Sequence, residues 1–339
     1  MITIDGSYGE GGGQILRTAL ALSLVTGKPF EITKIRAGRR KPGLMQQHLT
    51  ALNAARRIGD AEVDGNTIGS AAFRFIPKSV RPGSYHFSVG TAGSCTLVLQ
   101  AILPALLTAD GPSRIDLEGG THNPFAPPFD FLEKAFLPLI CRMGPTVSAQ
   151  LGQPGFYPAG GGRFSIMIRP VKRLKRLDLL TRGAIRKRTA RAIVAKLPGH
   201  IAARELKVVR ESLSWPETCL QTEAVPLSRS PGNVLIIEVE SEHITEVFTG
   251  FGQRGVPAER VAAGTVREVR DYLAADVPAG RHLADQLLLP LSLAGGGRFR
   301  TLKPTRHTET NAQIIQQFLD VETKMSRMKR DVWEISVAR

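Results

Sequence analysis

Cysteine is scarce in this 339-residue chain, and long apolar runs are missing from it. The three cysteines, Cys95, Cys141 and Cys219, are odd in number and widely spaced, which fits neither a disulfide framework nor a compact zinc-ligand pattern. No apolar stretch is long enough to cross a bilayer, and residues 1–5 lack the basic-then-apolar order of a signal peptide. The sequence therefore predicts a cytoplasmic protein that is neither exported nor inserted into a membrane.

Acidic residues are also in short supply. The 30 Asp and Glu residues face 45 Lys and Arg residues, which gives a formal net charge of +15. Such a field attracts polyanions in a salt-dependent way, so nucleic acid is a candidate partner. A solvated basic surface without a specific ligand explains many of the individual side chains equally well.

The excess of basic residues is greatest between residues 169 and 210, where only Asp178 and Glu205 oppose it. Aromatic residues are absent from this stretch, so it lacks the stacking platforms usual in single-strand binding. We expect it to guide a nucleic acid electrostatically, without reading bases.

Ordinary fractions of hydrophobic (42%) and charged (22%) residues favour a compact fold, and the patterning repeats an order of strand, helix, strand, helix. The first round covers strand 2–4, helix 14–26, strand 30–35 and a helix that follows Pro42 and Gly43 and ends at 58. The second covers strand 85–89, helix 94–108, strand 114–117 and helix 128–143. The third begins with strand 163–168 and resumes with helix 282–293, strand 298–302 and helix 311–318.

An insertion between about residues 184 and 280 interrupts the third round. It carries its own expected strands at 189–196, 219–224 and 234–239, and helices at 201–213 and 257–274. The predicted fold is therefore α/β, with a large domain of three repeated units over residues 1–183 and 281–339 and a smaller inserted α/β domain over residues 184–280.

A glycine-rich turn at residues 5–14 precedes the first helix and contains Glu10 and Gln14. Glycines permit close backbone approach to a phosphate at a helix start, although this turn lacks the Walker lysine and a purely structural turn is as good an explanation. Arg17 lies one turn into the helix.

A cationic cluster, Arg36, Arg39, Arg40 and Lys41, precedes the second helix, which carries Gln47 and His48. Arginine binds phosphate through two parallel donors, so the cluster suits an oriented phosphate chain. A solvated turn is the alternative.

Two later segments supply candidate nucleotide contacts. Gln100 is a lone amide in an apolar helix and needs a partner, either a nucleotide or an internal hydrogen bond, whereas Cys95 fits a packed thiol better than a nucleophile. The run 119–130 is stiffened by three prolines and ends in Asp130; it could support a base or ribose, or simply start the next helix.

His307 and Asp285 complete the candidate set. His307 is expected in a loop just before a helix, where an unprotonated ring nitrogen could act as a nucleophile, although a loop histidine alone is more often a surface residue. Asp285 starts an otherwise apolar helix and could hold a ribose, a metal or a catalytic side chain, or could cap the helix.

Together these motifs resemble the RNA 3′-terminal phosphate cyclase family through nearly the whole chain. The matching segments are Gly9-Glu10-Gly11-Gly12-Gly13-Gln14-Ile15-Leu16-Arg17, Ile35-Arg36-Ala37-Gly38-Arg39, Lys41-Pro42-Gly43-Leu44, Ala92-Gly93-Ser94-Cys95-Thr96, Gly155-Phe156-Tyr157-Pro158-Ala159-Gly160-Gly161-Gly162 and Ala284-Asp285-Gln286. The resemblance implies three α/β repeats, similar to the C-terminal domain of a bacterial translation initiation factor, with a small inserted domain.

The resemblance also implies a mechanism. ATP adenylylates His307, AMP passes to an RNA 3′-phosphate, and the adjacent 2′-hydroxyl closes a 2′,3′-cyclic phosphate. It assigns catalysis to His307, Glu10, Arg17 and Arg39, with Glu10 binding a divalent metal, Mg²⁺ or Mn²⁺. RNA or phosphate contacts are Arg36, Gln47 and His48, and ATP contacts are Gln100, Pro127, Asp130, His282, Leu283, Ala284, Asp285 and Gln286.

One departure from the family pattern is His282, which replaces a tyrosine that stacks on adenine opposite a proline. A smaller ring should weaken contact with the base; alternatively, His282 caps its helix. Two competing functions are a noncatalytic cyclase-like RNA-binding protein, against which His307 argues, and an enolpyruvyl transferase, which shares repeated α/β units but needs neither ATP nor a nucleophilic histidine.

Overall fold

The computed structural model describes residues 1–339, and three of its four sheets share one strand order. In each sheet, the first two strands in sequence order pair in parallel, and the other two strands pair antiparallel. The fourth strand in sequence order lies between the second and the third. The first sheet holds β1 (Ile2–Asp5), β2 (Phe30–Thr33), β4 (Phe73–Ile76) and β3 (Glu62–Asp64). The second holds β5 (Ser84–Ser88), β6 (Ser113–Gly119), β8 (Gly162–Arg169) and β7 (Thr146–Gln153). The third holds β9 (Leu177–Leu179), β14 (Gly296–Thr301), β16 (Val332–Ala338) and β15 (Glu322–Lys329).

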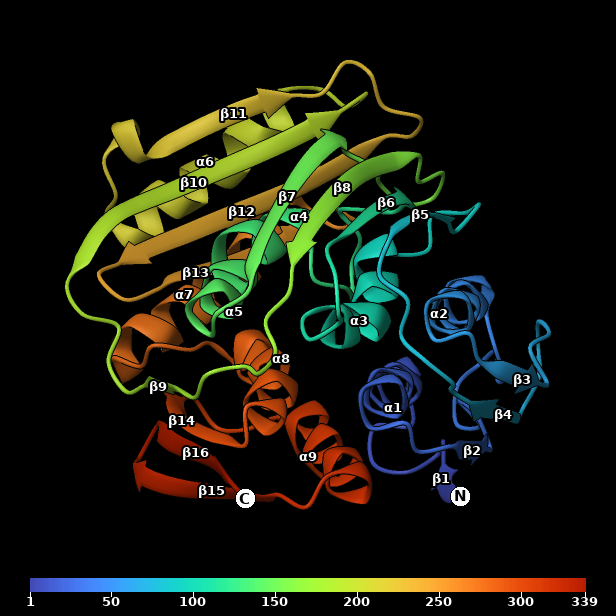
Figure 1. Ribbon diagram of the computed structural model, residues 1–339. Helices are drawn as coiled ribbons and strands as arrows, with labels where there is room; N and C mark the ends of the chain where they lie inside the picture. Colours follow the sequence, from blue (N-terminus) through green and yellow to red (C-terminus); the bar gives the residue numbers. More distant parts are fainter.

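Helices fill the space between these three sheets (Figure 1). They are α1 (Gly13–Thr26), α2 (Gln46–Ile58), α3 (Cys95–Leu106), α8 (Arg281–Leu293) and α9 (Arg306–Phe318). The expected helix 128–143 is divided into α4 (Phe129–Phe131), a π-helical turn η1 (Leu132–Phe136) and α5 (Leu137–Arg142). Helix α1 packs on α2, α3 and α9, and α8 packs on α9, so residues far apart in the sequence meet at the centre.

The fourth sheet lies between β9 and α8 in the chain. It contains, in spatial order, β11 (Leu220–Ala224), β10 (Ile185–Ala195), β12 (Gly232–Ser241) and β13 (Thr245–Phe251). The sheet packs against α6 (His200–Leu213) and α7 (Ala258–Ala275). A 3₁₀ turn, η2 (Glu217–Cys219), precedes β11. Nearly all of the smaller of two apolar core clusters comes from this segment, with Trp215 and Tyr272 as its largest side chains. The larger cluster joins the other three sheets and their helices. None of the helices combines the length and apolar character needed to span a membrane.

The mixed α/β class predicted from the sequence is confirmed, but one strand assignment is wrong. Strand 163–168 was expected to open a third round; it is instead β8, which pairs with β6 and β7 in the second sheet. The third sheet begins at β9, a strand of three residues. An alternating pattern predicts a half-buried strand but carries no information about its partner, which is why the assignment failed.

Several strands were not predicted at all: β3, β4, β7, β9, β13, β15 and β16. Most are short or half-exposed; β15, for example, reads ETKMSRMK and is held by its antiparallel pairing with β16. Pairing in the folded chain, rather than intrinsic preference, makes these segments strands.

Two helix starts also differ from expectation. Helix α2 begins at Gln46, three residues after Gly43, and α9 begins at Arg306, not at Asn311. Thr305 caps α9 by accepting a hydrogen bond from the Thr308 N–H (3.3 Å). His307 therefore lies in the first turn of a helix, not in the preceding loop.

Candidate active site at the ends of α1, α8 and α9

The glycine-rich turn before α1 allows three elements to meet. Gly9 and Gly11 have positive φ angles of 55° and 60°, which residues with a Cβ rarely adopt. A Cβ on Gly13 would collide with the ring of His48 and lie 2.9 Å from Arg17 Nη1. The turn is anchored to α9 because the Glu10 N–H donates a hydrogen bond to Thr310 Oγ1 (3.2 Å).

His307 is held by a relay of side chains from all three helices. Its Nδ1 lies 2.8 Å from Gln14 Oε1, and Gln14 Nε2 donates to Asp285 Oδ1 at 2.6 Å. An ionised carboxylate only accepts hydrogen bonds, so Asp285 turns the NH₂ of Gln14 toward itself and leaves Oε1 facing the imidazole. Nδ1 must then carry the proton, which leaves the Nε2 lone pair of His307 free.

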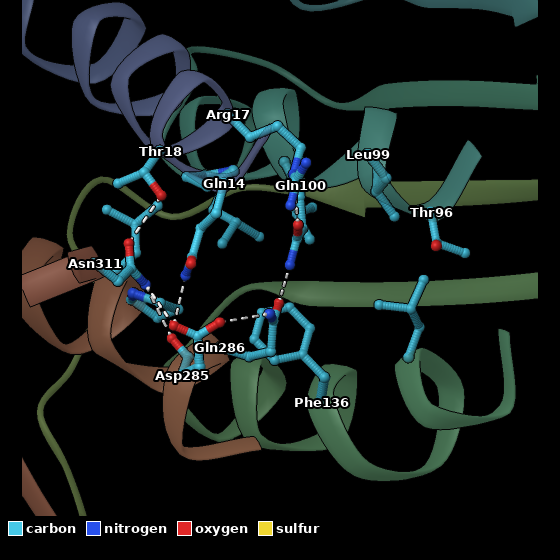
Figure 2. Close-up of a pocket in the computed structure, with 16 residues that line it drawn as sticks. Gln14, Arg17, Thr18, Thr96, Leu99, Gln100, Phe136, Asp285, Gln286 and Asn311 are labelled. Atoms are coloured by element: carbon cyan, nitrogen blue, oxygen red, sulfur yellow. Dashed lines mark hydrogen bonds between the residues drawn. The ribbon is translucent and has the colours of Figure 1, made fainter. Parts of the chain in front are cut away.

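Asn311 completes the support for Asp285 (Figure 2). Its Nδ2 donates to the main-chain oxygen (3.1 Å) and Oδ1 (3.2 Å) of Asp285, while its own Oδ1 accepts from Thr18 Oγ1 at 2.8 Å. These bonds cross from α8 to α9 and from α9 to α1. The relay therefore depends on the packing of three helices and not on one local motif.

Electrostatics keep His307 neutral. Burial lowers its pKa below the usual value of 6.5; the negative charge of Asp285 opposes this shift, and the positive charges of Arg17 and Arg39 add to it. Burial raises the pKa of Asp285, and the hydrogen bond from Gln14 acts in the opposite direction. About half of the His307 side chain is exposed, so its free nitrogen is accessible to a substrate.

Glu10 and Arg39 face the free nitrogen. His307 Nε2 lies 3.8 Å from Glu10 Oε1, and Glu10 forms an ion pair with Arg39. Arg39 Nη2 also donates to the main-chain oxygen of Glu10 (3.1 Å). The predicted catalytic residues His307, Glu10 and Arg39 therefore lie together.

A cavity beside this group is lined by Gln14, Arg17, Gln100, Asp285 and Gln286 (Figure 2). Arg17 Nε donates to Gln100 Oε1 at 3.0 Å, and Gln100 Nε2 donates to Gln286 Oε1. Gln100 thus has internal hydrogen-bond partners, one of the two alternatives open from its sequence. Burial lowers the pKa of Arg17 to about 10, which leaves it charged at neutral pH.

Cys95 on the same helix is fully buried, and burial raises the pKa of its thiol to about 12. Its Sγ donates to the main-chain oxygen of Gly120 (3.1 Å). The thiol is packed and protonated, as the sequence predicted.

Of the predicted phosphate ligands, His48 borders the glycine-rich turn, whereas Gln47 contacts Ser94 at the start of α3. His48 is buried against Gly13 and Arg17; burial and the charges of Arg17 and Arg36 lower its pKa to about 3. Its Nδ1 accepts from the Met45 N–H (3.1 Å), so Nε2 carries the proton and points toward the start of α1. Gln47 Oε1 accepts from the Ser94 N–H at 3.1 Å.

Arg36 braces its own loop. Its Nη1 donates to the main-chain oxygens of Lys41 (2.7 Å) and Gly43 (2.9 Å). Both of these hydrogen bonds use the same guanidinium nitrogen. Arg40 and Lys41 beside it are exposed.

Five predicted ATP ligands, Pro127, Asp130, His282, Leu283 and Ala284, are not part of the cavity lining. Asp130 binds His122 Nε2 (2.8 Å) and Arg191, and although burial alone would raise its pKa, these partners lower it to about 2. The main-chain oxygen of Pro127 accepts from Thr96 Oγ1 (2.7 Å). Leu283 and Ala284 are buried core residues of α8.

His282 is 77% exposed and lies 3.9 Å from Glu268 Oε2. Gly280 is the N-cap residue of α8 and the cap makes no side-chain hydrogen bond, so neither His282 nor Asp285 caps this helix. The capping alternative for both residues is wrong.

From the sequence, Gln14 is placed only in a turn that could bind a phosphate, and Asn311 and Thr310 are given no role, yet these three residues support the site most directly. Each is a buried or half-buried polar residue in the first two turns of a helix with a strongly apolar face. A buried polar side chain needs a hydrogen-bond partner. A polar residue on the apolar face of a helix is therefore the feature of the sequence that could have pointed to these three residues.

Comparison with known sequences agrees with this geometry. A family model described as RNA 3′-terminal phosphate cyclase matches residues 8–325. Proteins of that name from Koribacter versatilis (strain Ellin345) and Ectopseudomonas mendocina (strain ymp) are 52% identical over 326 residues and 51% identical over 321 residues. These alignments cover 96% and 95% of this chain and 92% and 93% of the relatives. The protein of that name from Salmonella agona (strain SL483) is 45% identical over 339 residues, which are 100% of this chain and 98% of the relative.

The family match and the relatives both extend over almost the whole chain, including the turn, cavity and helices described above. This chain belongs to the RNA 3′-terminal phosphate cyclase family and is an enzyme.

Proposed function

We propose that this chain uses ATP to convert the 3′-phosphate of RNA into a 2′,3′-cyclic phosphate, with His307 as the nucleophile. The observation that carries the proposal is the contact between His307 Nδ1 and Gln14 Oε1, which leaves Nε2 unprotonated and 3.8 Å from Glu10. A free imidazole lone pair beside positive side chains suits attack on a phosphorus atom.

In the first step, Nε2 attacks the α-phosphorus of ATP, and the bond to the β-phosphate oxygen breaks to release pyrophosphate. The imidazole ring becomes positively charged and keeps its Nδ1 proton. Gln14 accepts that proton in a hydrogen bond, and Asp285 behind it supplies the negative charge that stabilises the ring. Arg17 and Arg39 offset the charge on the departing phosphates.

In the second step, an oxygen of the RNA 3′-phosphate attacks the phosphorus of the histidine adduct, and the P–N bond breaks. The RNA end then carries AMP through a phosphoanhydride. In the third step, the neighbouring 2′-oxygen attacks the RNA phosphorus, its proton passes to solvent, and the phosphoanhydride bond between that phosphorus and the AMP oxygen breaks to release AMP. Little substrate movement is needed, because the nucleophile is already on the adjacent carbon.

The donor set near Nε2 fits a divalent metal held partly by substrate. Glu10 is the carboxylate there, and no group of three His, Cys, Asp or Glu side chains in the structure could hold a metal alone. Mg²⁺ is commonly bound by one or two carboxylates together with substrate phosphates. Glu10 would hold Mg²⁺ or Mn²⁺, and the ion would neutralise phosphate charge.

We assign the nucleotide to the cavity beside Gln100, Asp285 and Gln286, and RNA phosphates to Arg36, Gln47 and His48. The neutral Nε2–H of His48 and the charged Arg17 at the start of α1 support this arrangement, since helix starts favour anions. Roles for Pro127, Asp130 and His282 in binding ATP stay predictions from the family pattern.

We also propose the division into a large domain over residues 1–183 and 281–339 and an inserted domain over residues 184–280. The shared strand order of three sheets supports three related units, each extended by two antiparallel strands. The separate apolar cluster around Trp215 and Tyr272 supports the inserted domain. Three free cysteines agree with the cytoplasmic location expected from the sequence.

The central test is His307→Ala with ATP labelled at the α-phosphate. We expect the variant to lose both the covalent label and cyclisation, while His86→Ala on β5, whose side chain is exposed, keeps both. An RNA whose terminal 2′-hydroxyl is replaced by hydrogen should accept AMP but not cyclise.

The outcomes separate the competing functions. Persistent label in His307→Ala would identify another nucleophile. A wild-type protein that binds RNA but takes no label would be the noncatalytic relative, and one that takes no label but transfers an enolpyruvyl group would be the transferase.

A further inference from the structure

Two large aromatic side chains are exposed on neighbouring loops. Phe125 is 97% exposed and Tyr157 is 68% exposed, although nearly all other phenylalanines in the chain are buried. Neither ring packs against another aromatic ring. The apolar core therefore does not explain why these residues are aromatic.

The backbone at Phe125 is strained as well. Its φ of 64° lies in the left-handed region, which is a genuine outlier for a bulky residue. Pro124 precedes it and Pro127 follows two residues later, so the loop has little freedom to relax. Such strain persists where the surroundings impose it, and it concentrates at sites that bind ligands.

The two loops form one rigid support. The main-chain N–H groups of Thr121 and His122 both donate to the Gly155 oxygen at 3.0 Å, and the Gly155 N–H donates to Thr121 Oγ1 at 2.8 Å. Phe156, next to Tyr157, packs on the His122 ring with centroids 5.6 Å apart. Phe125 and Tyr157 thus project from loops fixed to each other.

This support adjoins the proposed active site. Thr96, which lines the cavity with Gln14 and Gln100, donates to the main-chain oxygen of Pro127 at 2.7 Å. Phe125 is two residues from that contact. The loop is also tied to residues 90–94, because Asn123 Nδ2 donates to the main-chain oxygen of Ala92.

The surface around Tyr157 carries positive charge. Arg229 packs against Gly161, its side chain is 58% exposed, and its Nη2 lies 3.7 Å from Glu118. Arg163, 61% exposed, shares the same carboxylate at 3.5 Å. Two arginines thus face one glutamate, which leaves a net positive charge for a polyanion.

We propose that the bases of the single-stranded nucleotides preceding the RNA 3′-phosphate stack on Phe125 and Tyr157. The proposal rests on the proposed function, which makes the RNA 3′ end the substrate. Every base has a π-face, so this platform binds RNA without selecting sequence, and the arginines contact its phosphates. The basic segment at residues 169–210 lacks aromatic side chains and cannot supply such stacking.

Equilibrium binding of a fluorescent single-stranded oligoribonucleotide ending in a 3′-phosphate tests the proposal directly. Phe125→Ala and Tyr157→Ala should each raise the Kd roughly tenfold, and Phe125→Trp should retain the affinity. Leu227→Ala is the matched control, because Leu227 is 79% exposed on the adjoining loop but has no ring to stack. Against an oligonucleotide whose upstream nucleotides lack bases, Phe125→Ala and wild type should bind alike.

Equal Kd values for wild type and the Phe125→Ala/Tyr157→Ala double variant would overturn the proposal. So would a variant that needs more ATP for covalent labelling while RNA binding is unchanged, because the ring would then serve the nucleotide. Failure of the proposed function has a different signature, namely no cyclisation by the wild-type enzyme, and the binding comparison is decisive in either case.

Discussion

At the scale of single residues, the protonation of His307 is set by an amide that cannot itself ionise. Gln14 presents an oxygen to Nδ1 only because Asp285 accepts from its nitrogen (2.6 Å) and Asn311 fixes Asp285 in turn. An inverted amide would present NH₂ to the imidazole and favour the opposite tautomer. Asp285, which contacts Gln14 and not His307, therefore determines which ring nitrogen of His307 is free to react.

Asp285→Asn should shift the pH dependence of His307 adenylylation to lower pH. The charge of Asp285 raises the pKa of His307 against the lowering effect of burial, so its removal lowers that pKa further. The rate of AMP labelling should then stay high to lower pH than in wild type, while its plateau falls by about tenfold or more because the charged ring loses its counter-charge. Rates of AMP labelling measured on the acidic side of the pH profile test this prediction. It is contradicted if the pH at which the rate is half-maximal rises or stays the same in Asp285→Asn.

At the scale of the secondary-structure elements, α6 and β12 are joined through a buried glutamate. Glu205 on α6 is fully buried; its Oε2 accepts from Asn233 Nδ2 (2.9 Å), and its Oε1 has no partner. Burial raises the pKa of Glu205 to about 7 from the usual 4.5. The folded state therefore keeps a proton that the unfolded chain releases.

Stability should accordingly fall as the pH rises from about 4.5 to about 7, because the folded state binds more protons over this range. The contribution of Glu205 to this loss is on the order of 3 kcal/mol. Glu205→Gln should make the free energy of unfolding in urea less dependent on pH over that range. Glu211→Gln, on the exposed side of the same helix, is the control and should leave the dependence unchanged.

At the scale of the whole molecule, the net charge of +15 is unevenly placed. The exposed residues Arg186, Lys187 and Arg188 lie together on β10, in the sheet that Figure 1 shows at the top, away from β15. Long-range attraction of a polyanion depends on such a local density of positive charge, and it weakens as the salt concentration rises.

RNA affinity should therefore fall more than about tenfold between roughly 50 and 200 mM monovalent salt. Replacing Arg186, Lys187 and Arg188 with Gln should reduce the slope of log K against log salt by up to about 2, since each lost phosphate contact on a single strand contributes about 0.7. Replacing Lys324, Arg327 and Lys329 on β15 removes the same charge and is the control. Equal slopes for the two triple variants would exclude β10 as an RNA path.

The sequence alone specified much of what is local. Period 3.6 located α1, α3 and α8, and the glycines before α1 marked a turn where backbone and side chains pack closely, as the contact between Gly13 and His48 requires. The order of the motifs along the chain also indicates the family. These features depend on neighbouring residues or on a linear pattern, so they are readable from the chain.

Tertiary structure decided what depends on distant partners. Strand β8 pairs in the second sheet, and β15 is a strand only because it pairs with β16. Gln14, Asp285 and His307 are separated by more than 270 and then by about 20 residues in sequence, yet they form one hydrogen-bonded relay because α1, α8 and α9 pack together. A hydrogen bond depends on distance and direction in space, and only the folded chain supplies those.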